Sequence, residues 1–225
     1  MATTEEIIKS RHSVREYLDK PIEGEILEIL QKEIADSNEE SGLNMEFVLN
    51  EKNAFEKFPL NNFENCKNYI VIMGKKEDKK LQEKAGYYGE RIVLKAQELG
   101  LNTCWVALTY NKKELPCTIK EDEKVVILIT IGYGANQGVE HSIKRIEDVV
   151  KKSYSVIPGW FDKGVEFALY APTAMNRQKF MFILVSSKEV KIKDTGIGPF
   201  TKIDLGIVKY HFELGAGKEN FSWVE

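Results

Sequence analysis

Two arginines flank a serine in residues 11–15, whose sequence is RHSVR. The guanidinium groups of Arg11 and Arg15 offer forked donors that suit a phosphate group, and the Ser13 hydroxyl could donate to another phosphate oxygen. The alternative interpretation is a solvated basic turn, which spacing alone favours. This segment therefore indicates an anion site only in combination with other segments.

A second segment, APTAMNRQ at residues 171–178, indicates a polar loop. Pro172 ends the preceding helix, and Thr173, Asn176 and Gln178 then present short polar groups. The amides of Asn176 and Gln178 could pair with the edge of a heterocycle that carries both donors and acceptors. The alternative is an ordinary connection from helix to strand, stabilised by local asparagine hydrogen bonds.

Two further segments contain glycine. In GLNTCWVAL, residues 100–108, the backbone of Val106, Ala107 and Leu108 could approach a flat ligand, whereas Trp105 is better explained as core packing. In IGYGANQG, residues 131–138, the glycine spacing misses G-x-G-x-x-G by one and no long helix follows, which excludes a dinucleotide fingerprint. Lys144 and Arg145, which follow this loop, could add charge around a phosphate or could be solvated surface cations.

Helices and strands must position these residues, and the spacing of apolar residues predicts where they lie. Apolar spacing predicts helices over 23–34 and 86–99, the second followed by Gly100 where a C-terminal glycine belongs. Strands are predicted over 45–49 and 68–74, and the apolar run 124–134 predicts a central strand. Helix, loop, strand and helix then recur after residue 155, so we expect an internally duplicated α+β fold with a mainly antiparallel central sheet flanked by helices. Residues 1–150 would form the first copy, and residues 151–225 a shortened second copy that completes one core.

The amino-acid composition argues against several classes of protein. The 225 residues include 32 Lys and Arg against 35 Asp and Glu, a net charge of −3, which argues against a nucleic-acid binder. Three scattered cysteines and three scattered histidines indicate neither a disulfide scaffold nor a metal site. The longest apolar run, 125–131, is too short for a bilayer, and no signal peptide is visible. We expect a cytoplasmic protein with no membrane or nucleic-acid partner.

Taken together and in this order, RHSVR, GLNTCW, IGYG followed by KR, and APTAMNRQ resemble the nitroreductase family of flavoproteins, and within it the Thermotoga-type subgroup. Ordinary members carry the APS-type loop soon after the R-x-S-x-R segment. Here the early stretch DSNEESGLNMEF lacks that pattern, and APTAMNRQ lies in the second half. Because members are usually homodimers with flavin at the interface, the resemblance implies a monomer that acts as a pseudo-dimer with one complete flavin site. Further association of such chains is left open.

The resemblance also implies residue roles. Arg11 resembles the phosphate-binding arginine, Ser13 the hydroxyl on the ribityl chain and Arg15 the basic group at the pyrimidine edge, while His12 would contribute its backbone. The remaining cofactor-binding predictions are Asn61, for which Asn62 is the alternative, Val106, Ala107, Leu108, Lys144, Arg145, Pro172, Thr173, Ala174, Asn176 and Gln178. Ala107 and Leu108 depart from the glycine that the family often has near flavin N5.

The chemistry implied is that of FMN. A hydride would pass from NAD(P)H through flavin N5 to a small-molecule electron acceptor such as a nitroaromatic or a quinone, with no side-chain nucleophile or acid–base pair. Two alternatives belong to other classes. One is a flavin-binding module of the same fold without turnover, and the other is a structural or interaction protein without a ligand.

Overall fold

The computed structural model describes residues 2–58, 62–151 and 157–224. Contacts divide the chain into two compact units. We call residues 10–81 and 91–140 the N-terminal unit, and residues 1–9, 82–90 and 141–225 the C-terminal unit. Each unit is described by itself. Among the described residues, none of the helices combines the length and apolarity that a membrane span requires.

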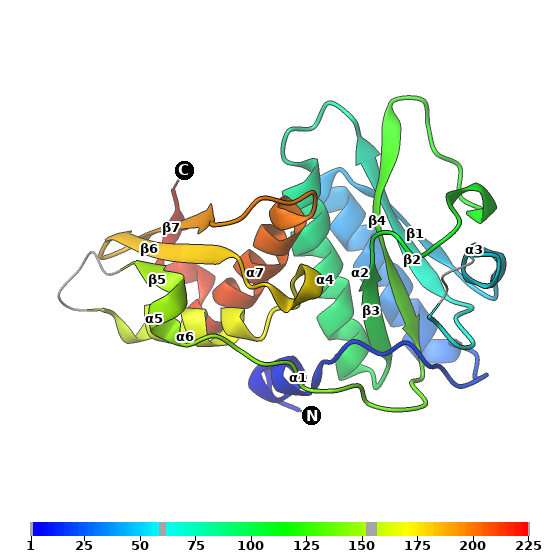
Figure 1. Ribbon diagram of the computed structural model, residues 1–225, viewed down its shortest axis with the longest axis horizontal. Coiled ribbons are helices and arrows are strands. Elements are labelled where there is room, and N and C mark those ends of the chain that lie inside the picture. Colours follow the sequence, from blue (N-terminus) through cyan, green and yellow to red (C-terminus); the bar gives the residue numbers. More distant parts are fainter. Residues whose placement is uncertain (1, 59–61, 152–156, 225) are drawn as a thin grey trace. The chain divides into compact units, whose positions relative to one another are not determined.

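The N-terminal unit is built on an antiparallel sheet (Figure 1). Its strand order is β1-β2-β4-β3, and the apolar strand β4 lies between two neighbours, which confirms its predicted central position. The helices and strands are α2 (Gly24–Ser41), β1 (Asn44–Val48), α3 (Asn53–Glu56), β2 (Tyr69–Lys75), the second half of α4 (Leu81–Glu98), β3 (Asn102–Val106) and β4 (Glu123–Gly132).

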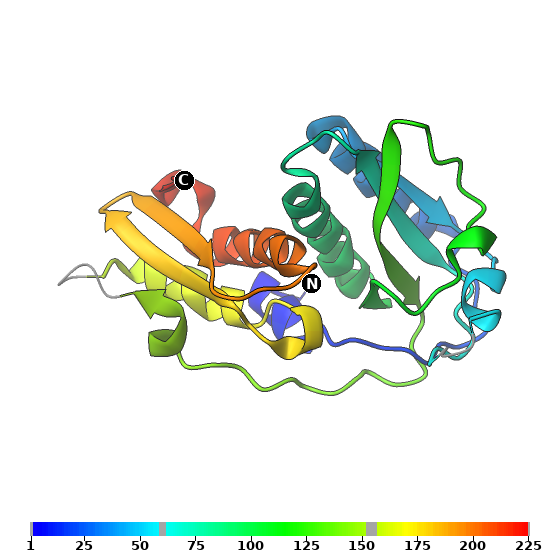
Figure 2. The same cartoon turned by 45° about the horizontal axis from the view of Figure 1, so that its top comes forward.

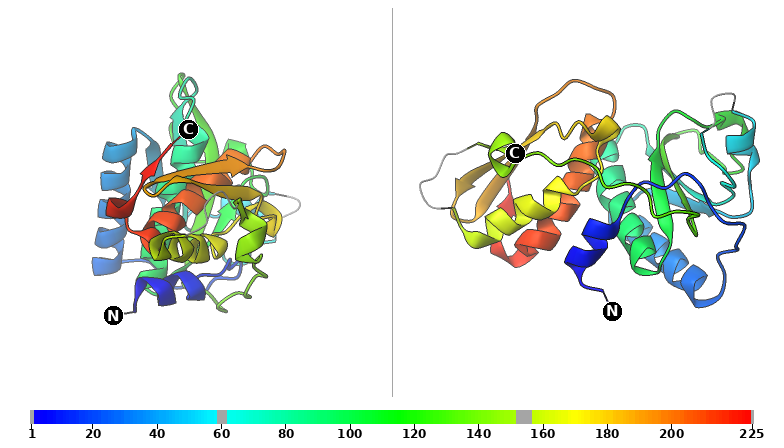
Figure 3. Two further views of the ribbon diagram at one scale, coloured as in Figure 1. Left: turned by 90° about the vertical axis from the view of Figure 1, so that its left-hand side faces the viewer. Right: turned by 60° about the horizontal axis from the view of Figure 1, so that its bottom comes forward.

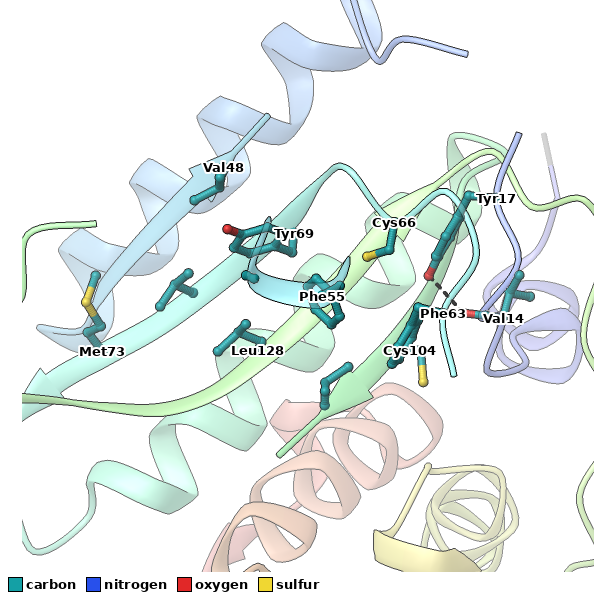
Figure 4. Packing of buried hydrophobic residues seen from close by; sticks show 13 residues of the cluster. Val14, Tyr17, Val48, Phe55, Phe63, Cys66, Tyr69, Met73, Cys104 and Leu128 are labelled. Carbon is teal, nitrogen blue, oxygen red and sulfur yellow. Dashed lines mark hydrogen bonds between the residues drawn. The ribbon is translucent and has the colours of Figure 1, made fainter. Parts of the chain in front are cut away.

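Strand β2 is buried on both faces of the sheet, since its residues 69–74 are all buried, in accord with its almost continuous apolar sequence. Side chains alternate along a strand, so Ile70 and Ile72 occupy one face while Tyr69, Val71 and Met73 occupy the other. The second group belongs to a buried cluster that also contains Val14, Tyr17, Phe55, Phe63, Cys66 and Cys104 (Figure 4). Helix α2 lies behind the sheet in Figure 1.

The C-terminal unit has a second sheet of order β5-β6-β7-β8. Its central pair, β6 and β7, is antiparallel, and short parallel pairs flank it. Helices α6 and α7 pack side by side (Figure 3), and α7 contacts β7 of the hairpin (Figure 2). The elements are α1 (Thr4–Ser10), α5 (Ile146–Val149), β5 (Val150–Lys151), α6 (Gly159–Leu169), β6 (Phe180–Ser186), β7 (Glu189–Asp194), α7 (Thr201–Ala216) and β8 (Ser222–Trp223).

Two glycines allow α7 to approach the first half of α4 closely. A Cβ atom added at Gly86 would lie 2.0 Å from the Ile203 carbonyl oxygen. A Cβ atom added at Gly206 would lie 2.0 Å from the Glu83 carbonyl oxygen. The contact is therefore reciprocal: each glycine meets the backbone three residues before the other glycine.

The predicted elements are present, with differences at their ends. Helix α4 begins at Leu81, five residues before its predicted start, because Leu81 and Ala85 continue its buried face across the polar residues between them. It ends as predicted before Gly100, whose φ is +78°. Strand β7 was not predicted, although its sequence EVKIKD alternates apolar and charged residues as a half-buried strand does. The strands form two sheets, one in each unit.

Candidate functional site

The RHSVR segment is extended and lies beside strand β3. Ser13 forms a parallel bridge with Thr103, and the Val14 N–H donates to the Thr103 carbonyl at 3.0 Å. Side chains alternate along extended backbone, so Arg11, Ser13 and Arg15 share one side while Val14 enters the core on the other. The R-x-S-x-R spacing therefore gathers two guanidinium groups and a hydroxyl on one side of a strand-like segment.

All three polar side chains act on the thiol of Cys104. Burial raises the pKa of the Cys104 thiol, and Arg15, the Ser13 hydroxyl and Arg11 oppose that shift. Arg11 is only 3% exposed, whereas Arg15 is exposed. The interpretation as a solvated turn therefore does not describe Arg11, because a buried guanidinium needs a specific environment.

The loop of residues 133–138 packs against this segment. A Cβ atom at Gly138, whose φ is +74°, would lie 2.7 Å from the His12 Cβ and 2.9 Å from the Ser13 carbonyl oxygen. Asn102 holds the loop: its Oδ1 accepts from the Gly134 N–H at 3.1 Å, and its Nδ2 donates to Gln137 at 3.2 Å. The glycines thus serve close packing, in accord with the absence of a dinucleotide fingerprint.

Asn102 was missed by sequence reasoning. It is 2% exposed at the start of β3, next to Thr103, which pairs with Ser13. A buried amide between Leu101 and Thr103 was the available signal, because buried polar groups need partners. Its position makes it the link between β3 and the 133–138 loop.

The His12 ring is partly buried. Burial, followed by the charge of Arg11, lowers the pKa of His12 below its usual value, while Glu140 opposes the shift. The ring is therefore neutral at pH 7. Within the described part of the chain, no hydrogen-bond partner is found for the buried His12 Nδ1.

Residues 106–108 lie where β3 ends. Val106 is the last residue of the strand and is buried, Ala107 is half-buried, and Leu108 is 71% exposed. Leu108 is thus exposed two residues beyond the end of β3, the strand whose Thr103 pairs with Ser13. Asn61, another predicted contact, lies outside the described residues.

The APTAMNRQ loop in the C-terminal unit has an unusual backbone. Met175, Asn176 and Gln178 have φ values of +53°, +52° and +46°. Residues other than glycine rarely adopt this region, and asparagine tolerates it best. Three such residues within four positions show that the surrounding structure imposes this conformation.

Side-chain amides hold the loop to the segment 142–144. Gln178 is 3% exposed, and its Nε2 donates to the Ser142 carbonyl and to Asn176 Oδ1, each at 2.9 Å. The Asn176 Nδ2 also donates to the Ser142 carbonyl, at 2.8 Å. The Gln178 Oε1 accepts from the Lys144 N–H at 2.9 Å. Only the bond between Gln178 and Asn176 is the local kind that the alternative interpretation expects, because the other bonds join the loop to residues more than 30 positions away in the sequence.

The first half of the loop contacts helix α7. The Thr173 hydroxyl oxygen accepts from the Gln178 N–H at 3.0 Å, and the Ala174 N–H donates to Asp204 Oδ1 at 3.0 Å. Pro172, Thr173 and Ala174 are all half-buried. Asp204, in the first turn of α7, was not predicted from the sequence.

The two predicted cations after the glycine loop have partners within the C-terminal unit. The Lys144 Nζ donates to the Gln178 carbonyl at 2.7 Å. The Arg145 guanidinium donates to both carboxylate oxygens of Asp148, at 3.0 and 3.2 Å, and this contact raises its pKa. Arg145 is also 73% exposed. The structure therefore gathers the predicted residues in two groups, one within each unit.

Comparisons with known proteins place these features in a family. Residues 3–216 match the sequence model of the family described as "Putative TM nitroreductase". None of the curated proteins matches the sequence.

Solved structures with the same fold include a "putative nitroreductase" from Thermotoga maritima, 23% identical, with a TM-score of 0.67 over 95% of this chain and 83% of that one. A "putative nitroreductase" from Desulfovibrio desulfuricans, solved in complex with FMN, is 18% identical, with a TM-score of 0.56 over 68% and 99%. A "putative NADH dehydrogenase/NAD(P)H nitroreductase" from Parabacteroides distasonis is 20% identical, with a TM-score of 0.55 over 68% and 100%. Because the family match spans nearly the whole chain, this protein belongs to the nitroreductase family described as "Putative TM nitroreductase".

Proposed function

We propose that the protein is a cytoplasmic FMN-dependent oxidoreductase that uses NAD(P)H to reduce a small-molecule acceptor. The observation that carries the proposal is the family match over residues 3–216, in which the extended RHSVR segment presents two arginines and a serine on one side. The FMN complex of the Desulfovibrio desulfuricans relative supports the choice of cofactor.

The residues present fit the phosphate group of FMN. Arg11 is buried beside Ser13 and Arg15, and guanidinium groups form charge-assisted, forked hydrogen bonds with a dianionic phosphate. His12 offers a buried Nδ1 for which the described residues supply no partner. Because the His12 ring is neutral, its Nδ1–H tautomer could donate a hydrogen bond to an oxygen of the cofactor.

Other residues would orient the cofactor. Val106, Ala107 and Leu108 offer backbone at the end of β3, and residues 172–178 offer a fixed loop. Bound FMN would supply the redox chemistry, which is hydride transfer between NAD(P)H and a nitroaromatic, quinone or similar acceptor. The charge of Arg15 would stabilise negative charge on the cofactor, an effect that is larger where water is excluded.

We also propose that the chain is an internally duplicated pseudo-dimer with one FMN site. Helix, antiparallel strand pair and helix occur in the order α2, β1, β2, α4 and again in the order α6, β6, β7, α7. The reciprocal contact of Gly86 and Gly206 supports this, since two-fold symmetry makes residue i meet j and j meet i. Only the first copy carries RHSVR, and only the second carries APTAMNRQ.

Spectroscopy of the purified protein tests this function. We expect flavin absorbance, FMN as the ligand released on denaturation, and loss of the absorbance when NADH or NADPH is added without oxygen. A flavin that neither nucleotide reduces would favour the alternative, a binding module without turnover. Protein that neither retains FMN nor binds added FMN would overturn the proposal.

A further inference from the structure

The 172–178 loop keeps a conformation that its own residues disfavour. Met175, Asn176 and Gln178 have positive φ values, and Met175 leaves its side chain 83% exposed. Burial of the Met175 side chain therefore does not offset the free-energy cost of its left-handed backbone. Strained backbone of this kind persists where the surroundings hold it, and it is typical of functional sites.

Contacts hold this loop near both ends. At its C-terminal end, Gln178 is clamped through its amide and its carbonyl by residues 142–144. At its N-terminal side, the Ala174 N–H donates to the carboxylate of Asp204 on α7 at 3.0 Å. The contact between Ala174 and Asp204 links the loop to α7, a helix of 16 residues.

The carboxylate of Asp204, which accepts the hydrogen bond from Ala174, has a raised pKa. Partial burial raises its pKa to about 6, the Ala174 N–H opposes that shift, and the carboxylate of Asp194, at the end of β7, adds to it. At neutral pH a carboxylate is thus kept charged in surroundings that disfavour the charge. A hydrogen bond to an ionised acceptor is stronger than one to a neutral acceptor.

We propose that Asp204 is a positioning residue, whose carboxylate holds the strained 172–178 loop through the Ala174 N–H so that the loop can contact a ligand. Loss of the negative charge then loosens the loop. The contact between loop and ligand rests on the proposed function, whereas the control of the loop by Asp204 does not.

The proposal makes the loop pH-dependent. Asp204 is ionised above about pH 6, so its contact with Ala174 is strong at neutral pH and weakens as the pH falls through that value. Asp194 is the other charged group that acts on Asp204, and its Oδ1 accepts from the Gly196 N–H at 2.8 Å. Removing the charge of Asp194 should therefore lower the pH at which the loop loosens.

Hydrogen exchange of a peptide covering residues 171–179 tests this in the full-length protein without added FMN. We expect its protection factor, corrected for the intrinsic rate at each pH, to fall about tenfold between about pH 7.5 and about pH 5. Asp204→Ala should have the low value at both pH values. Asp204→Asn keeps an acceptor oxygen without the charge, and should be intermediate and independent of pH. The matched control Asp194→Asn should keep the transition but move it to lower pH.

Three outcomes would overturn the proposal: unchanged protection of this peptide in Asp204→Ala at about pH 7.5, a pH-dependent fall that persists in Asp204→Asn, or an equal loss of protection in all peptides, which would mark a general structural role. If Asp204→Ala does not fold, the pH-independence of Asp204→Asn decides. FMN affinity provides a separate readout: because the FMN phosphate itself titrates at about pH 6, affinity should fall in both proteins over this pH range, but about tenfold more in the wild type than in Asp204→Asn. Failure of the wild type to bind FMN would contradict the proposed function and leave the exchange result to decide the role of Asp204.

Discussion

The connection from α2 to its antiparallel strand pair and the connection from α6 to its pair are very different. Between α2 and β1 the connection is Gly42 and Leu43, where Gly42 has a φ of +71° and donates to the Asn38 carbonyl at 2.9 Å. Between α6 and β6 it is the ten residues 170–179. The short connection uses its positive φ at a glycine, whereas the long one has it at three other residues.

This difference shows that the length of the second connection is not needed to make the turn. A single glycine is sufficient for the step from α2 to β1, as is common at helix C-termini. The second connection instead presents an exposed methionine and several half-buried polar groups on a backbone that hydrogen bonds hold in place. Such a loop is expected where a rigid framework carries a binding site.

The two connections can be compared because we propose that they belong to two copies of one unit. The substitutions with the largest expected effect on stability test this duplication. Gly86→Ala and Gly206→Ala each place a Cβ atom 2.0 Å from a carbonyl oxygen of the facing helix. Each should lower the free energy of unfolding by about 3 kcal/mol, and by similar amounts, in urea denaturation. Gly159→Ala, whose Cβ would meet nothing within 4 Å, is the control and should change it by less than about 0.5 kcal/mol. Very unequal effects of the two glycine substitutions would argue against a two-fold relation.

Next in size is the loss of the cations on the RHSVR segment. Arg11→Ala combined with Arg15→Ala should weaken FMN binding by about a hundredfold or more, because two charge-assisted contacts are removed. A fluorescence titration with FMN measures this. Lys20→Ala combined with Lys67→Ala removes the same charge from the N-terminal unit and should change the dissociation constant less than about threefold. Unchanged FMN stoichiometry in the double arginine variant would refute the assignment of this segment.

Asn176→Ala should weaken FMN binding about tenfold, because the loop loses a donor to Ser142 and an acceptor for Gln178. Asn176→Gly is the matched variant, since glycine keeps the positive φ without the side chain. If glycine restores most of the affinity, the backbone conformation matters more than the amide. Wild-type affinity in both variants would exclude a role of the long connection in binding.

The smallest effects are expected from substitutions at positive-φ residues, one in each of the two connections. Gly42→Ala should lower the free energy of unfolding by about 1 kcal/mol, since its Cβ meets nothing and only the positive φ is strained. Met175→Gly should raise it by about 0.5 kcal/mol, because relief of the left-handed backbone exceeds the entropy cost of glycine. Both are measured by urea denaturation. Effects of the same sign would show that Met175 is not strained.

Part of this structure could be predicted from the sequence. The apolar run in β4 indicates a central strand, and Gly100 marks the end of α4, because burial and a left-handed terminus each demand particular residue types. The extended conformation of RHSVR could not be predicted, since it depends on pairing with Thr103, far away in the sequence. The clamp on Gln178 and the anchor at Asp204 depend in the same way on distant partners. Positive φ values at Met175 and Gln178 run against the preferences of those residues, so no local signal marks them.

The central claim is that the chain binds one FMN. The most direct test is the number of FMN molecules per chain, obtained by titrating apoprotein of known concentration with FMN and by mass spectrometry of the intact complex. We predict one FMN per chain. Two FMN molecules would contradict the loss of the second site, and no bound FMN would contradict the proposed function.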